Sequence, residues 1–262
     1  MNPILATFFS ILGGVAALFS IITFMEDKIY TFLIYLHGKI PKGFLIFVTG
    51  TNGVGKTSVS KKLAKTLRLE YINVNYLREA LRSEPCHYSD EEYKILKLST
   101  YLLDDSNYSN GNEITDFQRQ CEMLSPAIKG NAAYLQKTGA STVFDGINIS
   151  PKRLLALGMP SQYVLFVNLR VTKNEVLLKR LDKKAKNLVE HRNKYRDNFV
   201  KILETGKNID ADFEYSPQMA TDKKQIIHKI CIDSTDKSIR RVRRLIIKEI
   251  RNIQKNPEKS DN

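Results

Sequence analysis

The sequence contains few cysteines and few histidines. Its three cysteines, Cys86, Cys121 and Cys231, are odd in number and lie far apart, so they indicate neither a disulfide framework nor a paired-cysteine zinc site. The four histidines share no ligand spacing, so nothing in the sequence supports a transition-metal site. A reducing compartment fits this composition best.

Acidic residues are also scarce relative to basic ones. The chain has 41 Lys and Arg against 28 Asp and Glu, a net charge of +13, which predicts anionic partners such as nucleotide phosphates, an anionic lipid surface or nucleic acid. No zinc-finger, aromatic RNP or basic-zipper pattern is present, so a nucleic-acid partner is disfavoured.

Charge is absent from residues 3–24, which read PILATFFSILGGVAALFSIITF. Twenty-two residues at the helical rise span roughly the 30 Å hydrocarbon core of a bilayer, so we expect a single-pass transmembrane anchor. The alternatives are a cleaved signal peptide, disfavoured because no basic residue precedes Lys28, and a buried helix of the soluble domain, disfavoured because every face is apolar. Lys28, Lys39 and Lys42 follow the stretch, which places the rest of the chain in the cytoplasm.

The remaining length suits one α/β domain. We expect an anchor and juxtamembrane segment at 1–42, a catalytic-sized domain at 43–256 and a disordered tail at 257–262. Within the first part, residues 29–40 are too short to span again; they suit either an interfacial stretch at the headgroups or an element packed on the domain.

A phosphate-binding loop follows the first predicted strand. The apolar run GFLIFVTG (43–50) leads into GTNGVGKT (50–57) and then into SVSKKLAKTLRL, whose Val59, Leu63 and Leu67 repeat at helical spacing. Strand, loop and helix therefore occur in the order that the motif requires. Lys56 is expected to reach the β- and γ-phosphates and Thr57 to ligate Mg²⁺. The residues predicted to contact the nucleotide are Gly50, Thr51, Asn52, Gly53, Val54, Gly55, Lys56, Thr57 and Ser58.

Alternation of strands and helices continues through the rest of the chain. Strands are predicted at 70–75, 138–146, 162–169 and 225–233, and helices at 90–103 and 115–137. This pattern predicts a parallel sheet with helices on both faces and ligands at the carboxyl ends of its strands. Asp145 ends the third strand, where its carboxylate can hold magnesium; the alternative role is a cap of the turn before Gly146.

Two basic segments follow. The run after the fourth strand contains Arg180, our candidate for neutralising the transferring phosphoryl group from a closing lid; most of its other basic residues are expected to be solvated. The stretch 236–255 carries isoleucines and Val242 on one stripe and basic residues on the other. It predicts an amphipathic helix docked on the domain, with a basic side that can face anionic lipid.

With these residues in view, the chain resembles the archaeal-type 2-phosphoglycerate kinase family, within the P-loop kinases that include zeta toxins and seryl-tRNA kinases. The likeness covers roughly residues 44–247 and rests on GTNGVGKTSVSKKLAKTL, INVNYLREALR, DFQRQCEMLSPAIKGN, GASTVFDGINISP and NFVKILETGKNIDADF. The resemblance implies ATP-dependent phosphorylation of a hydroxyl on a small, anionic substrate. It implies substrate contacts at Asn75, Arg78, Arg119 and Asn148; taken alone, both arginines would more often be surface salt-bridge partners.

The chain departs from that family at two positions. The related kinases carry an aspartate where this chain has Asn75, and a histidine where it has Asn148 in the run Asp145-Gly146-Ile147-Asn148. The anchor is also foreign to the metabolic enzyme. Two alternatives to an active small-molecule kinase therefore stay open: a catalytically weak nucleotide-binding regulatory protein, and a toxin-like or RNA-directed kinase.

Overall fold

The structure, a computed structural model, describes residues 40–84, 88–98, 116–159, 161, 163–185, 189–214 and 226–255. The predicted anchor at 3–24, almost all of the juxtamembrane segment and the predicted tail at 257–262 lie outside these residues. In the part of the chain that is described, no helix has the length and apolar character needed to cross a bilayer.

One parallel sheet organises the described residues. Its strands are β1 (Leu45–Thr49), β2 (Glu70–Asn73), β3 (Thr142–Asp145), β4 (Tyr163–Arg170) and β5 (Ile226–Asp233). Their spatial order is β2-β3-β1-β4-β5, with every neighbouring pair parallel. All five residues of β1 are buried, as expected for a central strand covered on both faces. The predicted α/β architecture is therefore confirmed.

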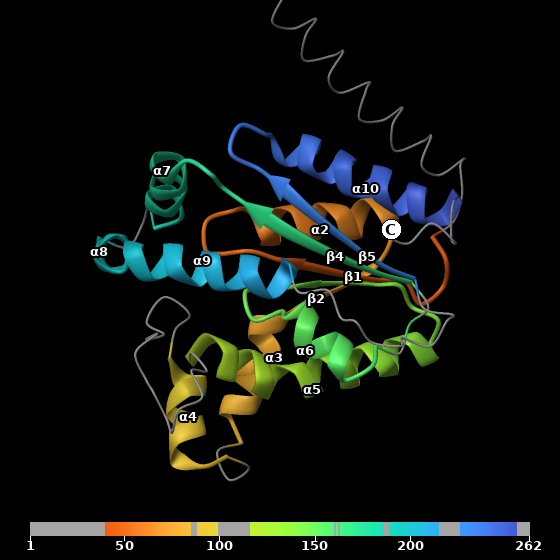
Figure 1. Cartoon of the computed structure of the whole chain (residues 1–262), viewed down its shortest axis with the longest axis horizontal. Coiled ribbons are helices and arrows are strands. Elements are labelled where there is room, and N and C mark those ends of the chain that lie inside the picture. The colour runs from red at the N-terminus through yellow and green to blue at the C-terminus, as the bar shows by residue number, and fades with distance from the viewer. Residues whose placement is uncertain are drawn as a thin grey trace, which may run out of the picture. The chain divides into compact units, whose positions relative to one another are not determined.

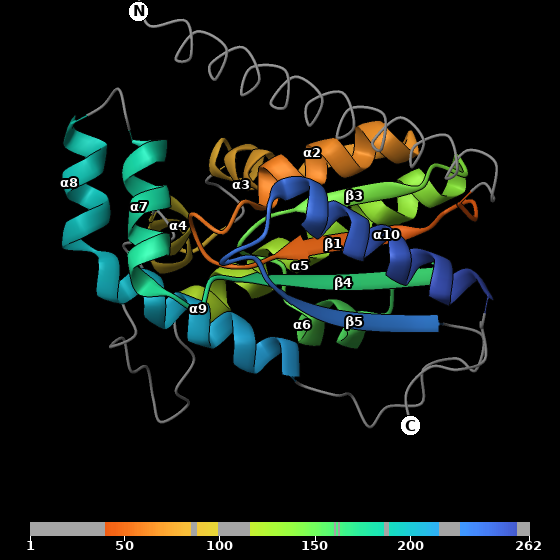
Figure 2. The same cartoon turned by 90° about the horizontal axis from the view of Figure 1, so that it is seen from above.

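Helices cover both faces of this sheet (Figure 1). Two of them, α2 (Lys56–Leu67) and α10 (Ile239–Lys255), lie on one face, whereas α3 (Val74–Arg82), α5 (Asp116–Lys137) and α6 (Pro151–Ala156) lie on the other. Phe213 of α9 (Phe199–Glu214) joins the core of the second face. The remaining helices are α4 (Asp90–Lys97), beside α3 and α5, and α7 (Asn174–Lys184) and α8 (Val189–Asp197), which pack together near the carboxyl ends of the strands (Figure 2).

The core is centred on three phenylalanines from the middle strands. Phe47 of β1 is paired in register with Phe144 of β3 and Phe166 of β4, and the ring centroids lie 5.0 and 5.1 Å apart. All three are fully buried. Since a slip of one residue would turn each ring to the opposite face of the sheet, this row favours a single register.

Three elements differ from the sequence prediction. The helix predicted at 90–103 ends at Lys97, because the backbone of Leu98 is extended. The second strand ends at Asn73 rather than at residue 75, because the Asn73 side chain accepts a hydrogen bond from the Asn75 backbone N–H and starts α3, a helix that the sequence analysis did not predict. The third strand begins at Thr142, not at 138, since α5 and its terminal turn occupy the preceding residues. The C-terminal amphipathic helix docks on the domain as predicted.

Candidate functional site

The loop between β1 and α2 has a backbone that only glycine accommodates at its start. Gly50 has a φ of 133°, and a Cβ there would lie 2.3 Å from the carbonyl oxygen of Leu169 on β4. Gly55, at the N-cap of α2, has a φ of 98° and no side chain that caps the helix. The first-turn N–H groups of α2 are therefore available to bind phosphate oxygens, with the positive end of the helix dipole behind them.

Lys56 is buried beside this loop. Its Nζ donates a hydrogen bond of 2.7 Å to the carbonyl oxygen of Thr51, which folds the ammonium back against the loop. Burial, with a smaller contribution from the charge of Lys184, lowers the pKa of Lys56 from 10.5 to about 7. A bound phosphate would supply a negative charge that stabilises the desolvated ammonium group of Lys56.

Thr57 and Asp145, the two predicted magnesium ligands, lie in direct contact. Thr57 Oγ1 donates to Asp145 Oδ2 at 2.7 Å, and the hydroxyl of Tyr71 on β2 donates to Asp145 Oδ1 at 2.8 Å. Burial and the adjacent carboxylate raise the pKa of Tyr71, so this hydroxyl remains a donor. Both carboxylate oxygens of the buried Asp145 thus accept from side-chain hydroxyls, which favours a site role over the alternative of a turn cap.

A basic cavity of about 330 Å³ lies over the loop. Helix α7 contributes Arg180, Lys183 and Lys184 to its wall, opposite Lys56 and Thr57. Cationic side chains facing exposed backbone N–H groups make a cavity suited to several phosphate groups. The predicted lid segment therefore supplies positive charge at the expected place.

A second cavity, of about 460 Å³, adjoins the first on the side of β5 and α10. Val54, Val59, Ile239 and Val242 give it an apolar wall, and Arg180 lines both cavities. Its size and apolar wall suit a nucleobase next to the phosphate groups.

Arg180 is held between these two cavities. Its guanidinium donates to the carbonyl oxygens of Ser234 and Thr235, at 2.7 and 3.0 Å, and to Ser234 Oγ at 3.1 Å. The predicted lid arginine is therefore anchored to the loop after β5 and stands at the boundary between the phosphate and base cavities. Its assignment to the transferring phosphoryl group stays a prediction.

The residues implied as substrate contacts fall into different settings. Asn75 is exposed on the first turn of α3, and Arg78 is buried one turn later, where burial lowers the pKa of its guanidinium. Arg119 of α5 forms an ion pair of 2.5 Å with Glu91 of α4, which is the salt-bridge role considered as its alternative. Asn148 is buried and donates to Gln120 Oε1 at 2.9 Å, so its amide group joins the loop after β3 to α5.

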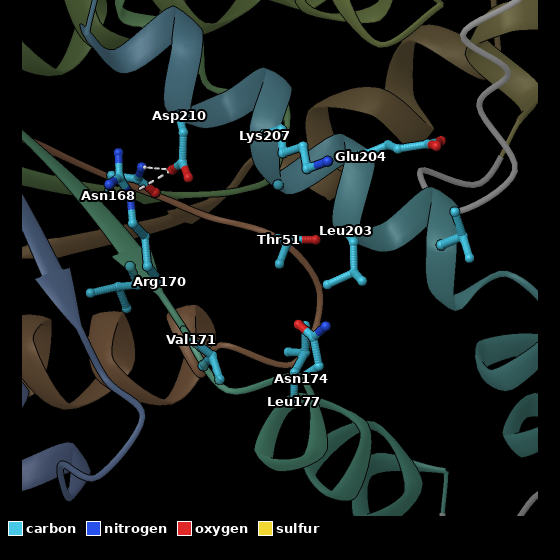
Figure 3. A pocket seen from close by; sticks show the side chains of 13 residues that line it. Thr51, Asn168, Arg170, Val171, Asn174, Leu177, Leu203, Glu204, Lys207 and Asp210 are labelled. Atoms are coloured by element: carbon cyan, nitrogen blue, oxygen red, sulfur yellow. Dashed lines mark hydrogen bonds and ion pairs between the residues drawn. The ribbon is translucent and has the colours of Figure 1, made fainter.

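A third cavity, of about 360 Å³, lies on the β4 side of the loop and is lined by parts of β4, α7 and α9 (Figure 3). Asp210 of α9 accepts from both Asn168 and Arg170 of β4, each at 2.7 Å. Thr51 lies at the centre of this view, and its hydroxyl donates to the carbonyl oxygen of Ile202 on α9 at 2.9 Å. Thr51 thus joins the phosphate-binding loop to α9.

Four residues that contribute to the site are not singled out by the sequence. Tyr71 was not recognised, because a tyrosine in a strand is usually a packing residue. Lys184 was one of several lysines in a basic run, with no signal to separate it from the others. Ser234 and Thr235 follow the fifth predicted strand, and their position at a strand end in a parallel sheet is the signal that could have identified them.

Comparison with known proteins places this geometry in a family. Residues 46–203 match the family described as the AAA domain. The chain belongs to the AAA domain family. The matched region of this AAA domain protein runs from β1 through the phosphate-binding loop to α9, so it contains the phosphate cavity with its loop lysine, Thr57 and Asp145.

Solved kinase structures resemble the AAA domain protein at low sequence identity. A gluconokinase from Sinorhizobium meliloti is 16% identical, with 84% of this chain and 97% of that chain covered and a TM-score of 0.48. The shikimate kinase from Acinetobacter baumannii, solved with shikimate, is 15% identical, with coverages of 81% and 94% and a TM-score of 0.41. The deoxyadenosine kinase from M. mycoides is 13% identical, with coverages of 80% and 100% and a TM-score of 0.42. These values carry no substrate to this chain, and the resemblance to 2-phosphoglycerate kinases stays a prediction.

Proposed function

We propose that this protein is an ATP-dependent kinase that transfers the γ-phosphoryl group to a hydroxyl of a small, anionic substrate. The observation that carries the proposal is the contact of Thr57 with Asp145 beside the buried Lys56, at the floor of a basic cavity. Phosphoryl transfer requires a phosphate-binding loop, oxygen ligands for Mg²⁺ and cationic side chains that face the phosphates.

The oxygen atoms present fit Mg²⁺, which prefers hard oxygen ligands and is commonly held by one or two protein groups together with substrate phosphates. Thr57 Oγ1 and Asp145 would hold the ion. When bound, magnesium neutralises charge on the β- and γ-phosphates. Lys56 binds the same phosphates after leaving the carbonyl oxygen of Thr51, and Tyr71 keeps the Asp145 carboxylate oriented.

In the transfer step, the acceptor oxygen forms a bond to the γ-phosphorus while the bond from that phosphorus to the β–γ bridging oxygen breaks. ADP leaves with the bond electrons, and the acceptor hydroxyl releases its proton to water. Lys56 and Lys184 stabilise the negative charge that accumulates on the phosphoryl oxygens. Because the transition state is loose, the acceptor need not lose its proton early, so a site without a carboxylate at position 75 can retain activity.

The proposal of an anionic acceptor is supported by a basic side chain on α3. Asn75 is exposed on the first turn of α3, and Arg78 is buried on the next turn. In this proposal the guanidinium of Arg78 binds a carboxylate or phosphate of the substrate, a pairing for which arginine can supply two hydrogen bonds. The resemblance to 2-phosphoglycerate kinases supports the same class, without identifying the molecule.

The proposal includes attachment of the enzyme to a membrane by residues 3–24, with the kinase domain in the cytoplasm. Its support is the uncharged 22-residue stretch and the lysines that follow it, because basic residues near the end of a span favour the cytoplasmic side. The cytoplasm is also the compartment that supplies ATP.

A transfer assay tests the proposed activity. The detergent-solubilised full chain is incubated with γ-labelled ATP, Mg²⁺ and a metabolite pool, and phosphorylated products are separated. Label should appear in a small anionic product with the parent protein and disappear with Lys56→Ala, while Lys137→Ala, which removes an exposed lysine at the far end of α5, should behave as the parent. ATP binding without any labelled product would favour the regulatory protein, and label in RNA would favour the RNA-directed kinase.

A further inference from the structure

Helices α2 and α10 pack against each other over one face of the sheet (Figure 1). Arg243 Nη1 of α10 donates to Thr66 Oγ1 of α2 at 3.0 Å, which fixes the two helices together. The apolar stripe of α10 is buried: Val242, Ile246 and Ile250 are each at most 2% exposed. Arg241 and Lys248 of α10 are exposed on the opposite side of the helix from this stripe, whereas Arg243 is buried against α2.

The exposed side chains on this surface are predominantly basic. We define the α2–α10 face by the exposed residues Lys61, Lys62, Lys65, Arg241 and Lys248. Helix α2 contains no acidic residue. In α10 the acidic residue is Glu249, whose carboxylate contacts His228 Nδ1 of β5 at 3.3 Å, on the side toward the sheet.

We propose that the α2–α10 face binds the anionic headgroups of a lipid bilayer. Its charge is complementary to the cytoplasmic leaflet, and long lysine and arginine side chains on adjacent helices can reach several headgroups at once. The chain before Ile40 adds a second argument. It holds an uncharged stretch, 3–24, that is long enough to span a bilayer, and a domain tethered in this way meets the headgroups at high effective concentration.

This binding mode leaves the phosphate cavity open. The cavity uses the first turn of α2, at Lys56 to Ser58, whereas the α2–α10 face begins one turn later, at Lys61. Lipid binding by the α2–α10 face does not require phosphoryl transfer. A protein that fails the kinase assay can therefore still bind lipid, and a protein that passes the kinase assay can lack lipid binding.

Vesicle co-sedimentation tests the inference. Residues 40–262 form a compact unit that contains the whole sheet and its core, so this fragment is used to remove the contribution of the anchor. It should sediment with vesicles of phosphatidylcholine mixed with phosphatidylserine and stay in the supernatant with phosphatidylcholine alone. Raising the salt concentration should release it, because exposed charges are screened.

Matched triple variants locate the surface. Replacing Lys62, Lys65 and Lys248 with glutamine should weaken binding to the anionic vesicles by at least about tenfold. The same change at Lys94, Lys97 and Lys137, exposed lysines of α4 and α5 on the opposite side of the sheet, should weaken it much less. Equal losses in the two triples would overturn the assignment of the face.

Two other results would show that the α2–α10 face does not bind lipid headgroups. No sedimentation with anionic vesicles would contradict the proposal. So would tighter binding to a homopolymeric RNA than to the vesicles, abolished by the same triple on α2 and α10, because the surface would then be assigned to nucleic acid. Circular dichroism of both triple variants checks that each remains folded. A loss of vesicle binding can then be attributed to the removed lysine charges.

Discussion

At the scale of single residues, the pKa of Lys56 connects nucleotide binding to pH. Burial lowers this pKa to about 7 in the free protein, and bound phosphate favours the ammonium and raises it. At pH 8, binding of ATP should therefore take up about nine-tenths of a proton, and the affinity for ATP should fall as the pH rises above 7. Isothermal titration calorimetry in two buffers of different ionisation enthalpy measures the uptake.

Lys56→Arg is the control, because a guanidinium remains protonated throughout this range and its binding enthalpy should not depend on the buffer. Identical enthalpies for the parent protein in both buffers would refute the coupling. The nucleotide-free protein should also respond: between pH 7 and 10.5 the unfolded chain binds more protons at Lys56 than the folded chain, so the free energy of unfolding should rise with pH across that window.

Tyr71 positions the Asp145 carboxylate through a single hydrogen bond. Tyr71→Phe removes the donor and keeps the ring, so the carboxylate loses its fixed orientation. The Mg²⁺ concentration for half-maximal turnover should rise roughly tenfold, with a small change in melting temperature. Tyr93→Phe, which removes a hydroxyl that donates to the carbonyl oxygen of Arg82, should leave the magnesium titration unchanged. A parent-like titration for Tyr71→Phe would return Tyr71 to a packing role.

The 2-phosphoglycerate kinases that this chain resembles carry an aspartate at the position of Asn75. An amide does not accept a proton near neutral pH, whereas a placed general base contributes about 10²- to 10⁴-fold to a proton-transfer step. Asn75→Asp should raise turnover with nearly unchanged ATP affinity. If Asn75→Asp lowers turnover on the identified substrate and Asn75→Ala abolishes it, Asn75 is an adapted substrate-binding residue.

Some residues of the site can be identified from their neighbours along the sequence, and others only from contacts in the folded protein. Lys56, Thr57 and the loop glycines could be predicted, because the motif fixes their neighbours along the chain. Asp145 could be predicted from its place at a strand end. Tyr71 could not, since its role depends on a contact with a residue 74 positions away, and nothing in the alternation of β2 distinguishes it from a packing residue.

At the scale of elements, α9 supports the phosphate-binding loop through Thr51. Thr51→Val keeps the shape of the side chain and removes the hydrogen bond to the Ile202 carbonyl oxygen. The free energy of unfolding should fall by about 1 kcal/mol, and the affinity for ATP should fall on the order of fivefold. Thr205→Val is the matched control, because it removes a hydroxyl that bonds only within α9, to the carbonyl oxygen of Lys201. ATP affinity that is equal in the two variants would exclude support of the loop by α9.

Helix α3 shows where element prediction from sequence fails. The run INVN favours a strand by composition, yet the side chain of Asn73 caps a helix that begins at Val74. An asparagine signals a turn, a cap or a strand end with equal ease, and the packing of α3 against β2 and α5 decides among them. The isoleucine stripe of 236–255, in contrast, repeats over many residues, and its helix was predicted closely.

At the scale of the whole molecule, attachment to a membrane is tested by fractionation. The intact chain should sediment with membranes and resist extraction by high salt or alkaline carbonate, because a spanning segment is held by the hydrophobic effect. The fragment 40–262 should be released by salt. An intact chain that remains in the high-speed supernatant would contradict the transmembrane anchor. Lipid binding by the α2–α10 face could still be tested on vesicles.

Most of the sheet could be predicted, since its buried strands are short apolar runs separated by helical sequence. The order of the strands could not be read from that pattern, because it depends on how helices pack across the two faces. Pairing of β1 with both β3 and β4 became visible only in three dimensions.

That pairing has a consequence for a chain still being synthesised. β1 lies between partners that follow it by about a hundred residues, and Gly50 packs closely against the carbonyl oxygen of Leu169 on β4. Contacts of such sequence separation form late. A nascent chain that has emerged only through α5 already contains the complete nucleotide motif, yet it lacks both neighbours of β1. ATP should therefore stabilise the domain only after β3 and β4 have joined the sheet.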